Sequence, residues 1–105
     1  MIINLTKKIF YDGKEYEELN MDLDGLRCQD LLVAENSARV IDKDKFQLWG
    51  TRHIMQILAL ACHVPISIIY ELSAKDFMRM QSAVINFFSD IISPASQEDS
   101  SVVPF

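Results

Sequence analysis

The sequence predicts one α+β domain, mainly helical, with an N-terminal β-hairpin packed on a bundle of three to four helices. Three observations support this prediction. Apolar and polar side chains alternate near the N-terminus on both sides of an Asp-Gly pair, as in a hairpin. Farther along, apolar residues recur at helical spacing, as in amphipathic helices. The chain has 105 residues, which is ordinary for one hydrophobic core and too short for two.

The hairpin is predicted over residues 3–19. Its turn is the Asp-Gly pair at residues 12–13, which supplies the positive φ angles of a type I′ turn. Apolar and polar residues still alternate from Leu19 to Leu23, and we interpret this stretch as an extension of the second strand after a bulge near residues 17–18. A two-stranded hairpin is only marginally stable alone, so one of its faces must pack on the helices that follow.

Four helices are predicted after the hairpin, over residues 26–40, 48–62, 65–72 and 74–92. Asp24 is the candidate N-cap of the first helix. Ser73 precedes the last helix and Asp76 follows it by three residues, which predicts a capping box. Residues 93–105 have the composition of a flexible tail, so the domain is predicted to span residues 1–92.

The second and last of these helices carry more apolar residues than one buried face requires. The core stripe of the second helix comprises Ile54, Ile57, Leu58, Ala61 and Cys62. The core stripe of the last helix comprises Phe77, Met80, Val84, Phe87 and Ile91, and a second stripe at a spacing of seven comprises Met78, Ile85 and Ile92. Two stripes on one helix imply two surfaces to cover, so some of this apolar surface is expected to bind a partner.

Composition and charge favour a protein partner. Half of the residues are hydrophobic, which is generous for a domain of this size. The formal net charge of -5 repels phosphate groups, so nucleic acid and anionic membranes are not expected as partners. The sequence has neither an apolar run of about 18 residues nor a signal-peptide pattern at its start, so the protein is expected to act in the cytoplasm where it is made.

No catalytic, cofactor-binding or metal-binding constellation is recognisable in the sequence. Cys28, His53, Cys62 and His63 are the soft or imidazole ligands, and none of them forms a CxxC or HxxxH spacing. We interpret both thiols as reduced core residues, with a disulfide as the alternative, and both histidines as boundary residues. The three glycines are isolated, which argues against a phosphate-binding loop. The sequence therefore predicts a protein that is not an enzyme.

Two further features allow alternative interpretations. Trp49 precedes the second helix and is expected in the core, with an exposed interface anchor as the alternative. The acidic residues between positions 15 and 24 are interpreted as a solubilising face, with a site for a cation or a basic partner as the alternative.

The order of several sequence blocks resembles the tail assembly chaperones of long-tailed bacteriophages. The matching blocks are Leu5–Tyr16, Leu19–Leu26, Asp30–Glu35, Leu58–Pro65, Leu72–Phe77 and Asn86–Phe88. Two of them contain elements similar to those of the family, Val-Pro at residues 64–65 and Leu-x-x-x-Asp-Phe at residues 72–77. Together the blocks cover about residues 3–90, and their order and spacing carry the resemblance.

The resemblance implies a protein of a phage or prophage that acts in the bacterial host cytoplasm and has no catalytic role. Such a protein binds and solubilises the tape-measure protein, a very long, largely helical and aggregation-prone polypeptide. It then helps to recruit tail-tube protein subunits, which displace it, so it is absent from the mature virion. Many members also have a longer form made by ribosomal frameshifting, which here would join after residue 93. A structural tail component, such as a connector or tube protein, is the alternative.

The residues expected to bind a partner are those that lie off the main core stripes, namely Met55, Met78, Ile85, Phe88 and Ile92. A client helix with an apolar stripe would lie in a groove between the second and last helices. Reversible binding of many copies along one long client would suit this role better than one tight complex. The second stripe of the last helix is also compatible with self-association.

Overall fold

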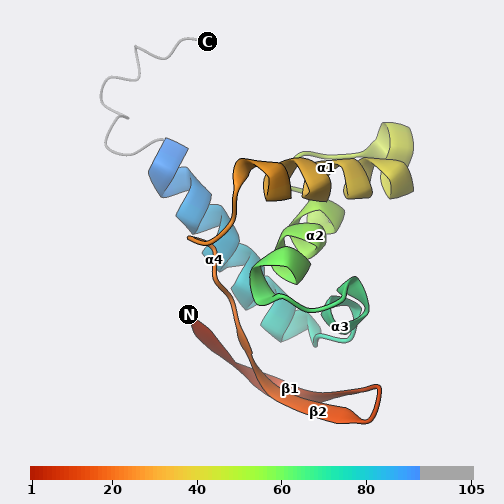
Figure 1. Ribbon diagram of the computed structural model, residues 1–105, viewed down its shortest axis with the longest axis vertical. Helices are drawn as coiled ribbons and strands as arrows, with labels where there is room; N and C mark the ends of the chain where they lie inside the picture. Colours follow the sequence, from red (N-terminus) through yellow and green to blue (C-terminus); the bar gives the residue numbers. More distant parts are fainter. Residues whose placement is uncertain (93–105) are drawn as a thin grey trace.

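The computed structural model describes residues 1–92 and confirms the predicted class, an N-terminal hairpin on a mainly helical α+β domain (Figure 1). Its elements are β1 (Ile2–Tyr11), β2 (Lys14–Asn20), α1 (Cys28–Asp42), the short 3-10 helix η1 (Lys43–Lys45), α2 (Thr51–Cys62), α3 (Ile66–Tyr70) and α4 (Ala74–Ile92). All four predicted helices are present, with ends close to those predicted. The predicted tail at residues 93–105 lies outside the described part of the chain.

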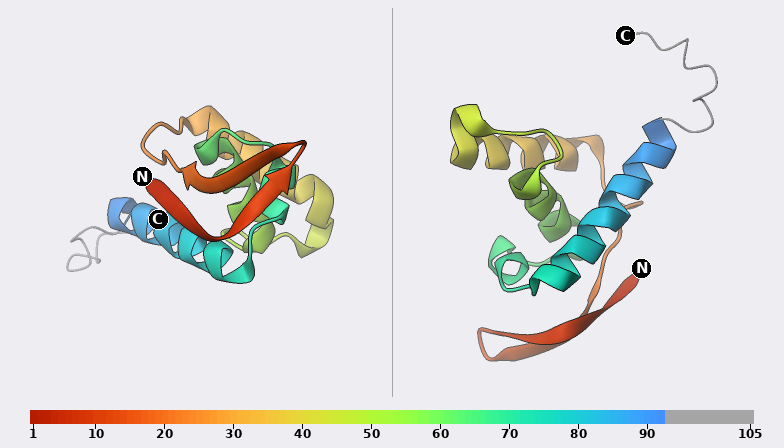
Figure 2. Two further views of the ribbon diagram at one scale, coloured as in Figure 1. Left: turned by 90° about the horizontal axis from the view of Figure 1, so that it is seen from below. Right: turned by 180° about the vertical axis from the view of Figure 1, so that it is seen from behind.

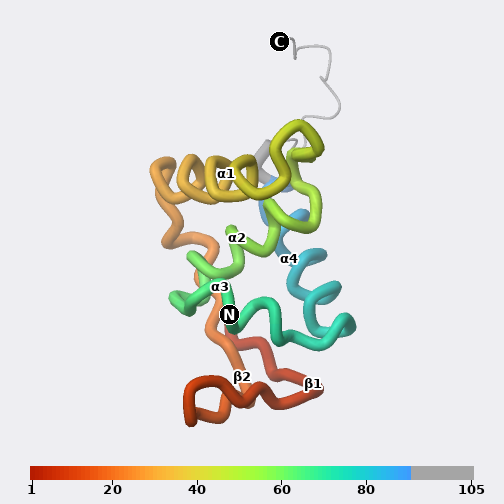
Figure 3. The backbone as a smooth tube through the Cα atoms, turned by 90° about the vertical axis from the view of Figure 1, so that its right-hand side faces the viewer, coloured from red at the N-terminus to blue at the C-terminus, as the bar shows by residue number. Residues whose placement is uncertain are grey.

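The hairpin and α1 lie at opposite ends of the molecule, with α2 and α4 between them (Figure 3). Figure 2 shows the hairpin lying across one end of the helices. The central element is α2, which contacts α1, α3, α4 and β2. Every residue of its predicted core stripe is buried, and the hairpin adds Ile3, Ile9 and Leu19 to the buried residues. Burial of these side chains in one core is the main term that stabilises the fold.

The middle of β1 carries additional residues. Regular antiparallel pairing is interrupted between Asn4 and Ile9, so the four residues Leu5–Lys8 stand opposite Glu17 alone. The bulge predicted near residues 17–18 was therefore assigned to the wrong strand. Additional residues on one strand bend the pair and leave backbone groups without a partner in the ladder.

The turn and the segment after β2 follow the sequence pattern in different ways. Both residues of the turn, at positions 12–13, have positive φ, as predicted. Beyond the end of β2, Met21 and Leu23 remain buried, but they are not part of the strand. The N–H of Asp22 donates instead to the carbonyl of Ala61 at 3.0 Å. The alternation beyond Asn20 therefore marks an irregular segment that packs along α2.

The start of α1 differs from the prediction. Its N-cap is Arg27, whereas Asp24 is exposed and lies before the helix. The carboxylate of Asp30 accepts the N–H of Arg27 at 2.9 Å, which satisfies one backbone donor at the helix end. Cys28, the first residue of α1, is exposed, so the prediction of a buried thiol was wrong there, whereas Cys62 is buried.

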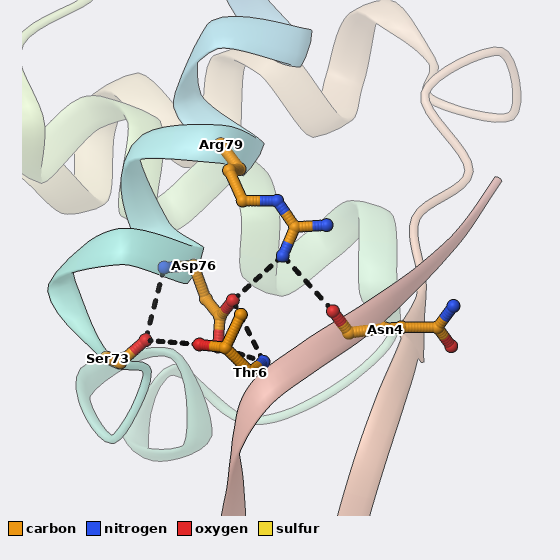
Figure 4. Close-up of polar contacts among 5 residues, drawn as sticks. All are labelled: Asn4, Thr6, Ser73, Asp76 and Arg79. Atoms are coloured by element: carbon orange, nitrogen blue, oxygen red, sulfur yellow. Dashed lines mark hydrogen bonds and ion pairs between the residues drawn. The ribbon is translucent and has the colours of Figure 1, made fainter.

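The first turn of α4 binds the irregular part of β1 (Figure 4). The hydroxyl of Ser73 accepts the N–H of Asp76 at 3.1 Å, as a predicted N-cap should. The carboxylate of Asp76, however, points to the hairpin: it accepts the N–H of Thr6 at 2.9 and 3.1 Å and the hydroxyl of Thr6 at 3.1 Å. Arg79 donates to this carboxylate at 3.0 Å and to the carbonyl of Asn4 at 3.2 Å. The predicted capping box is thus half formed, and its acidic member connects two elements.

Asp76 is fully buried, yet its environment favours the charged form. Burial by itself raises the pKa of the Asp76 carboxyl. The side chain of Ser73, the backbone and hydroxyl of Thr6 and the backbone of Lys7 together outweigh that effect and hold the pKa below its usual range. The Leu-x-x-x-Asp-Phe block at residues 72–77 therefore has a structural role in joining α4 to the hairpin.

None of the helices in residues 1–92 combines the length and the apolar character needed to cross a membrane.

Candidate partner-binding surface

The five residues predicted to bind a partner are divided between different surfaces. Ile85 and Phe88 line one hollow beside α4, and Met55 lines another near the start of α2. Met78 is 58% exposed on α4, seven residues before Ile85. Ile92 is the last residue of α4, and its side chain lies outside the described residues. The single groove between the second and last helices that was predicted is thus not formed by this set.

The hollow beside α4, called here the Trp49 hollow, is lined by Trp49, Ile85, Phe88 and Ser89 and has a volume of about 140 Å³. Its aromatic wall is made by two rings, those of Trp49 and Phe88, whose centres lie 5.2 Å apart. Phe88 also packs against the core and makes an edge contact with Phe87 at 5.0 Å. Phe88 therefore contributes to the core and also lines the surface hollow. Its position off the core stripe predicted only the surface role.

Trp49 is held in place by His53. The backbone N–H of Trp49 donates to Nδ1 of His53 at 2.9 Å, and the two rings lie 5.1 Å apart. His53 is buried, and its ring also lies 5.6 Å from that of Phe46. Burial is the main cause that lowers the pKa of His53, so the imidazole stays neutral and keeps Nδ1 free to accept. The prediction that His53 is a boundary residue was wrong, and Trp49 both packs on the core and lines a surface hollow.

Between Met80 and Ser89 the exposed side of α4, beside this hollow, carries no charge. No ionisable side chain occurs between Met80 and Ser89. The exposed residues of that stretch are Ser82, Ile85, Asn86 and Ser89, and Ile85 is 41% exposed. An exposed apolar side chain among small uncharged polar residues leaves little desolvation cost for an approaching apolar partner.

A second exposed apolar surface lies on the outer side of α1, and it was not predicted. The residues of α1 that are buried are two alanines, Ala34 and Ala38. Four of its five larger aliphatic side chains are exposed instead, namely Leu32, Val33, Val40 and Ile41, and the fifth, Leu31, is half-buried. The signal was present in the sequence, because alanines at a spacing of four mark a close helix contact that leaves bulkier neighbours outside.

The hollow lined by Met55 is mainly polar. Its volume is about 280 Å³, and the rest of its lining consists of Asp42, Lys45, Gln47, Gly50, Thr51 and Arg52. Its arginine is already paired, because Arg52 donates to Asp42 at 3.2 Å and to the hydroxyl of Tyr70 at 3.1 Å. Met55 therefore does not extend the apolar surface of α4.

The described residues do not assemble metal ligands. Within residues 1–92, no group of three or more His, Cys, Asp or Glu side chains is placed to hold a metal ion. Both cysteines are free thiols, and burial raises the pKa of Cys62 to about 11. On the hairpin, Glu15 and Glu17 are exposed and pair with Lys8 at 3.0 and 3.6 Å. The acidic run is thus exposed and partly compensated by a neighbouring lysine.

Comparison with models of known protein families, with curated proteins and with solved structures finds no match to this chain. Its function is therefore inferred from the surfaces described above and from the sequence resemblance.

Proposed function

We propose that the protein is a tail assembly chaperone of a long-tailed phage or prophage. In this role it acts in the bacterial cytoplasm, binds and solubilises the tape-measure protein, and helps to recruit tail-tube subunits during tail assembly. The observation that carries the proposal is the apolar surface that stays exposed on α1 and α4 beside a completed core.

The contrast between the core and this surface supports a binding role. Within the described residues, every buried side-chain nitrogen and oxygen has a hydrogen-bond partner, so the core contains no unpaired polar side-chain atom there. Large apolar side chains nevertheless remain outside it, including Met78 and Ile85 on α4 and Leu32 and Val40 on α1. Contiguous exposed apolar side chains on a small domain are typical of protein-binding surfaces. A long helical client offers the matching chemistry, because its apolar stripes need cover until assembly.

The charge distribution is suited to a chaperone that coats a client. The exposed glutamates of the hairpin lie at the end of the molecule opposite α1. Each copy has a net charge of -5, so coated client molecules repel one another and do not associate non-specifically. The acidic residues of the hairpin thus keep the coated client dispersed, while the exposed apolar side chains of the helices make the contact.

The small volume of the Trp49 hollow is suited to reversible binding. The Trp49 hollow holds about 140 Å³, which is space for little more than one side chain. One such contact is weak, but many copies along one polypeptide give a high total occupancy. Tail-tube subunits can then displace the copies one at a time.

The proposal is tested by co-expression with the tape-measure protein of the phage or prophage that encodes this chain. We expect the soluble fraction of the tape-measure protein to rise when the chaperone is present. Ile85→Asp should abolish this rescue, because it places a charge in the apolar contact. Asn86→Asp is the matched control: it adds the same charge on the same turn of α4 and should retain rescue. A tape-measure protein that stays insoluble beside the wild-type chain would contradict the proposal.

A second test separates a chaperone from a structural tail component. Mass spectrometry of purified virions should find tail-tube protein and tape-measure protein but not this chain. Its presence in stoichiometric amounts in mature particles would identify it as a structural component.

A further inference from the structure

We propose that α4 presents an exposed heptad seam that docks one client helix as in a coiled coil, with one client side chain inserted into the Trp49 hollow. This inference rests on the proposed function, because it specifies how the client is held.

The spacing of the residues along α4 defines the seam. Met78, Gln81, Ile85 and Phe88 follow one another at intervals of three, four and three, which is the alternation of a and d positions in a coiled coil. Met78 and Ile85 are exposed, and Gln81 and Phe88 are partly buried. The buried stripe through Met80 and Val84 lies on another side of the same helix. The seam is therefore available while α4 remains packed on the core.

The Trp49 hollow has the geometry of a hole for a knob. In a coiled coil, each knob enters a hole formed by four residues of the facing helix. Three residues of α4 line the hollow at positions i, i+3 and i+4, the spacing that such a hole requires. They are Ile85, Phe88 and Ser89. The indole of Trp49 closes the hollow from the loop before α2, and its contact with His53 keeps that wall in place. The hole exists before a partner arrives, so binding requires little reorganisation.

The volume of the hollow limits the size of the knob. A cavity of about 150 Å³ lined by apolar side chains accepts one benzene molecule. The Trp49 hollow, at about 140 Å³, therefore fits a single leucine or phenylalanine side chain. Two aromatic walls favour phenylalanine, because its ring can make edge contacts with Trp49 and Phe88.

The surroundings of the seam favour a client helix over a second copy of this chain. The exposed positions that flank the seam are Lys75, Ser82 and Ser89, so beside the Trp49 hollow they are small and uncharged, and an ion pair can influence pairing only near Met78. The helix has 19 residues, so at 1.5 Å per residue a strip about 10 Å wide along it covers on the order of 300 Å². A stable dimer requires about 800 Å² per partner. The seam is thus suited to weak contacts repeated along one long heptad-containing helix.

The single tryptophan of the chain makes the inference directly measurable. The probe is a synthetic, tryptophan-free helical peptide of four heptads with leucine at a and d and phenylalanine at one central d position. Titration into the full-length protein should give a saturable change in Trp49 emission. Replacing the central phenylalanine by alanine should weaken binding about tenfold. A peptide of the same composition in scrambled order should give no change, and equal binding of all three peptides would overturn the inference.

Variants of the protein supply the matched test. Ser89→Phe fills the hollow from an exposed position and should abolish the fluorescence response while the circular dichroism and the melting temperature stay near wild type. Asn86→Phe adds the same ring on the same helix off the seam and should bind as wild type. If Ser89→Phe still binds with wild-type affinity, the hollow is not the anchor site.

Two outcomes separate this inference from the proposed function. If the wild-type chain and Ser89→Phe rescue the tape-measure protein equally, the seam is wrong and the chaperone role stands. If the peptide binds as expected but the tape-measure protein stays insoluble, the chaperone role is wrong and the seam stands. A dimer in sedimentation equilibrium that Ile85→Asp dissociates would show that a second copy occupies the seam, which would also overturn the inference.

Discussion

The two halves of α4 use opposite chemistry. The N-terminal half contains Asp76 and Arg79, whose charged groups bind each other and the backbone of β1. The C-terminal half up to Ser89 has no ionisable side chain and leaves Ile85 exposed beside the Trp49 hollow. One helix therefore fixes the hairpin at one end and offers an uncharged surface at the other. In α4, the buried charge of Asp76 and its partner Arg79 thus serve the fold, while the proposed binding surface consists of apolar and small polar groups.

The largest effect on stability is expected from removing the buried carboxylate in the N-terminal half of α4. Asp76→Ala removes the acceptor of the Thr6 N–H and hydroxyl and leaves Arg79 without its ion-pair partner. We expect the free energy of unfolding, measured by urea denaturation, to fall by about 2–4 kcal/mol. Asp90→Ala is the control, because this residue is exposed and should change stability by less than about 0.5 kcal/mol. Equal effects of the two substitutions would contradict the role given to Asp76.

The same carboxylate should give a pH dependence. Because the folded-state pKa of Asp76 lies below its usual range, its contribution is fully present above the unfolded-state pKa, near 4. It is lost as the pH falls through the still lower folded-state pKa. Urea midpoints measured from pH 7 down to pH 3 should therefore drop below about pH 4 in the wild type, and less so in Asp76→Asn. Parallel curves for the two proteins would exclude Asp76 as the source.

Substitutions in the uncharged half should separate folding from binding. Phe88→Asp replaces a ring that packs on Trp49 and Phe87 by a charged group, so we expect the free energy of unfolding to fall by about 1–3 kcal/mol. Ile85→Asp affects a more exposed side chain and should change stability by about 0.5 kcal/mol while abolishing rescue of the client. Thermal unfolding monitored by circular dichroism compares the two. If Ile85→Asp unfolds the domain as readily as Phe88→Asp, the exposed surface is part of the core.

The smallest expected effect is a difference in labelling rate. Exposed Cys28 should react with iodoacetamide at pH 8, whereas buried Cys62, whose pKa is raised to about 11, should react only when the structure opens. Peptide mapping by mass spectrometry distinguishes the two thiols. Asp76→Ala should speed the labelling of Cys62 and leave that of Cys28 unchanged. Rapid labelling of Cys62 in the wild type would show that the core near the hairpin is open.

Sequence periodicity predicted those features that local pattern determines. The alternation around the Asp-Gly turn located the hairpin, and the spacing of Ile54, Ile57 and Leu58 located the central helix. Ser73 was correctly assigned as an N-cap, because its hydrogen bond lies within one turn of its own helix.

Features that depend on distant segments were not predictable in the same way. The partner of Asp76 is Thr6, seventy residues away, and a capping-box pattern alone points the carboxylate back to its own helix. The side of α1 that faces solvent depends on which neighbour its alanines contact. Trp49 and Phe88 come together only because the loop before α2 reaches α4. In the fold, Met55 therefore lies in a different hollow from Ile85 and Phe88. Sequence periodicity could not show this, because it does not encode tertiary structure.

The attachment of β1 to α4 also has a consequence for self-assembly. A strand at the rim of a two-stranded sheet is a template on which other chains can add and grow into fibrils. At Thr6 and Asn4 the backbone N–H and carbonyl of β1 are already taken by side chains of α4, so polymerisation cannot start at these positions. At this rim the fold is thereby protected from the kind of aggregation that the protein is proposed to prevent in its client.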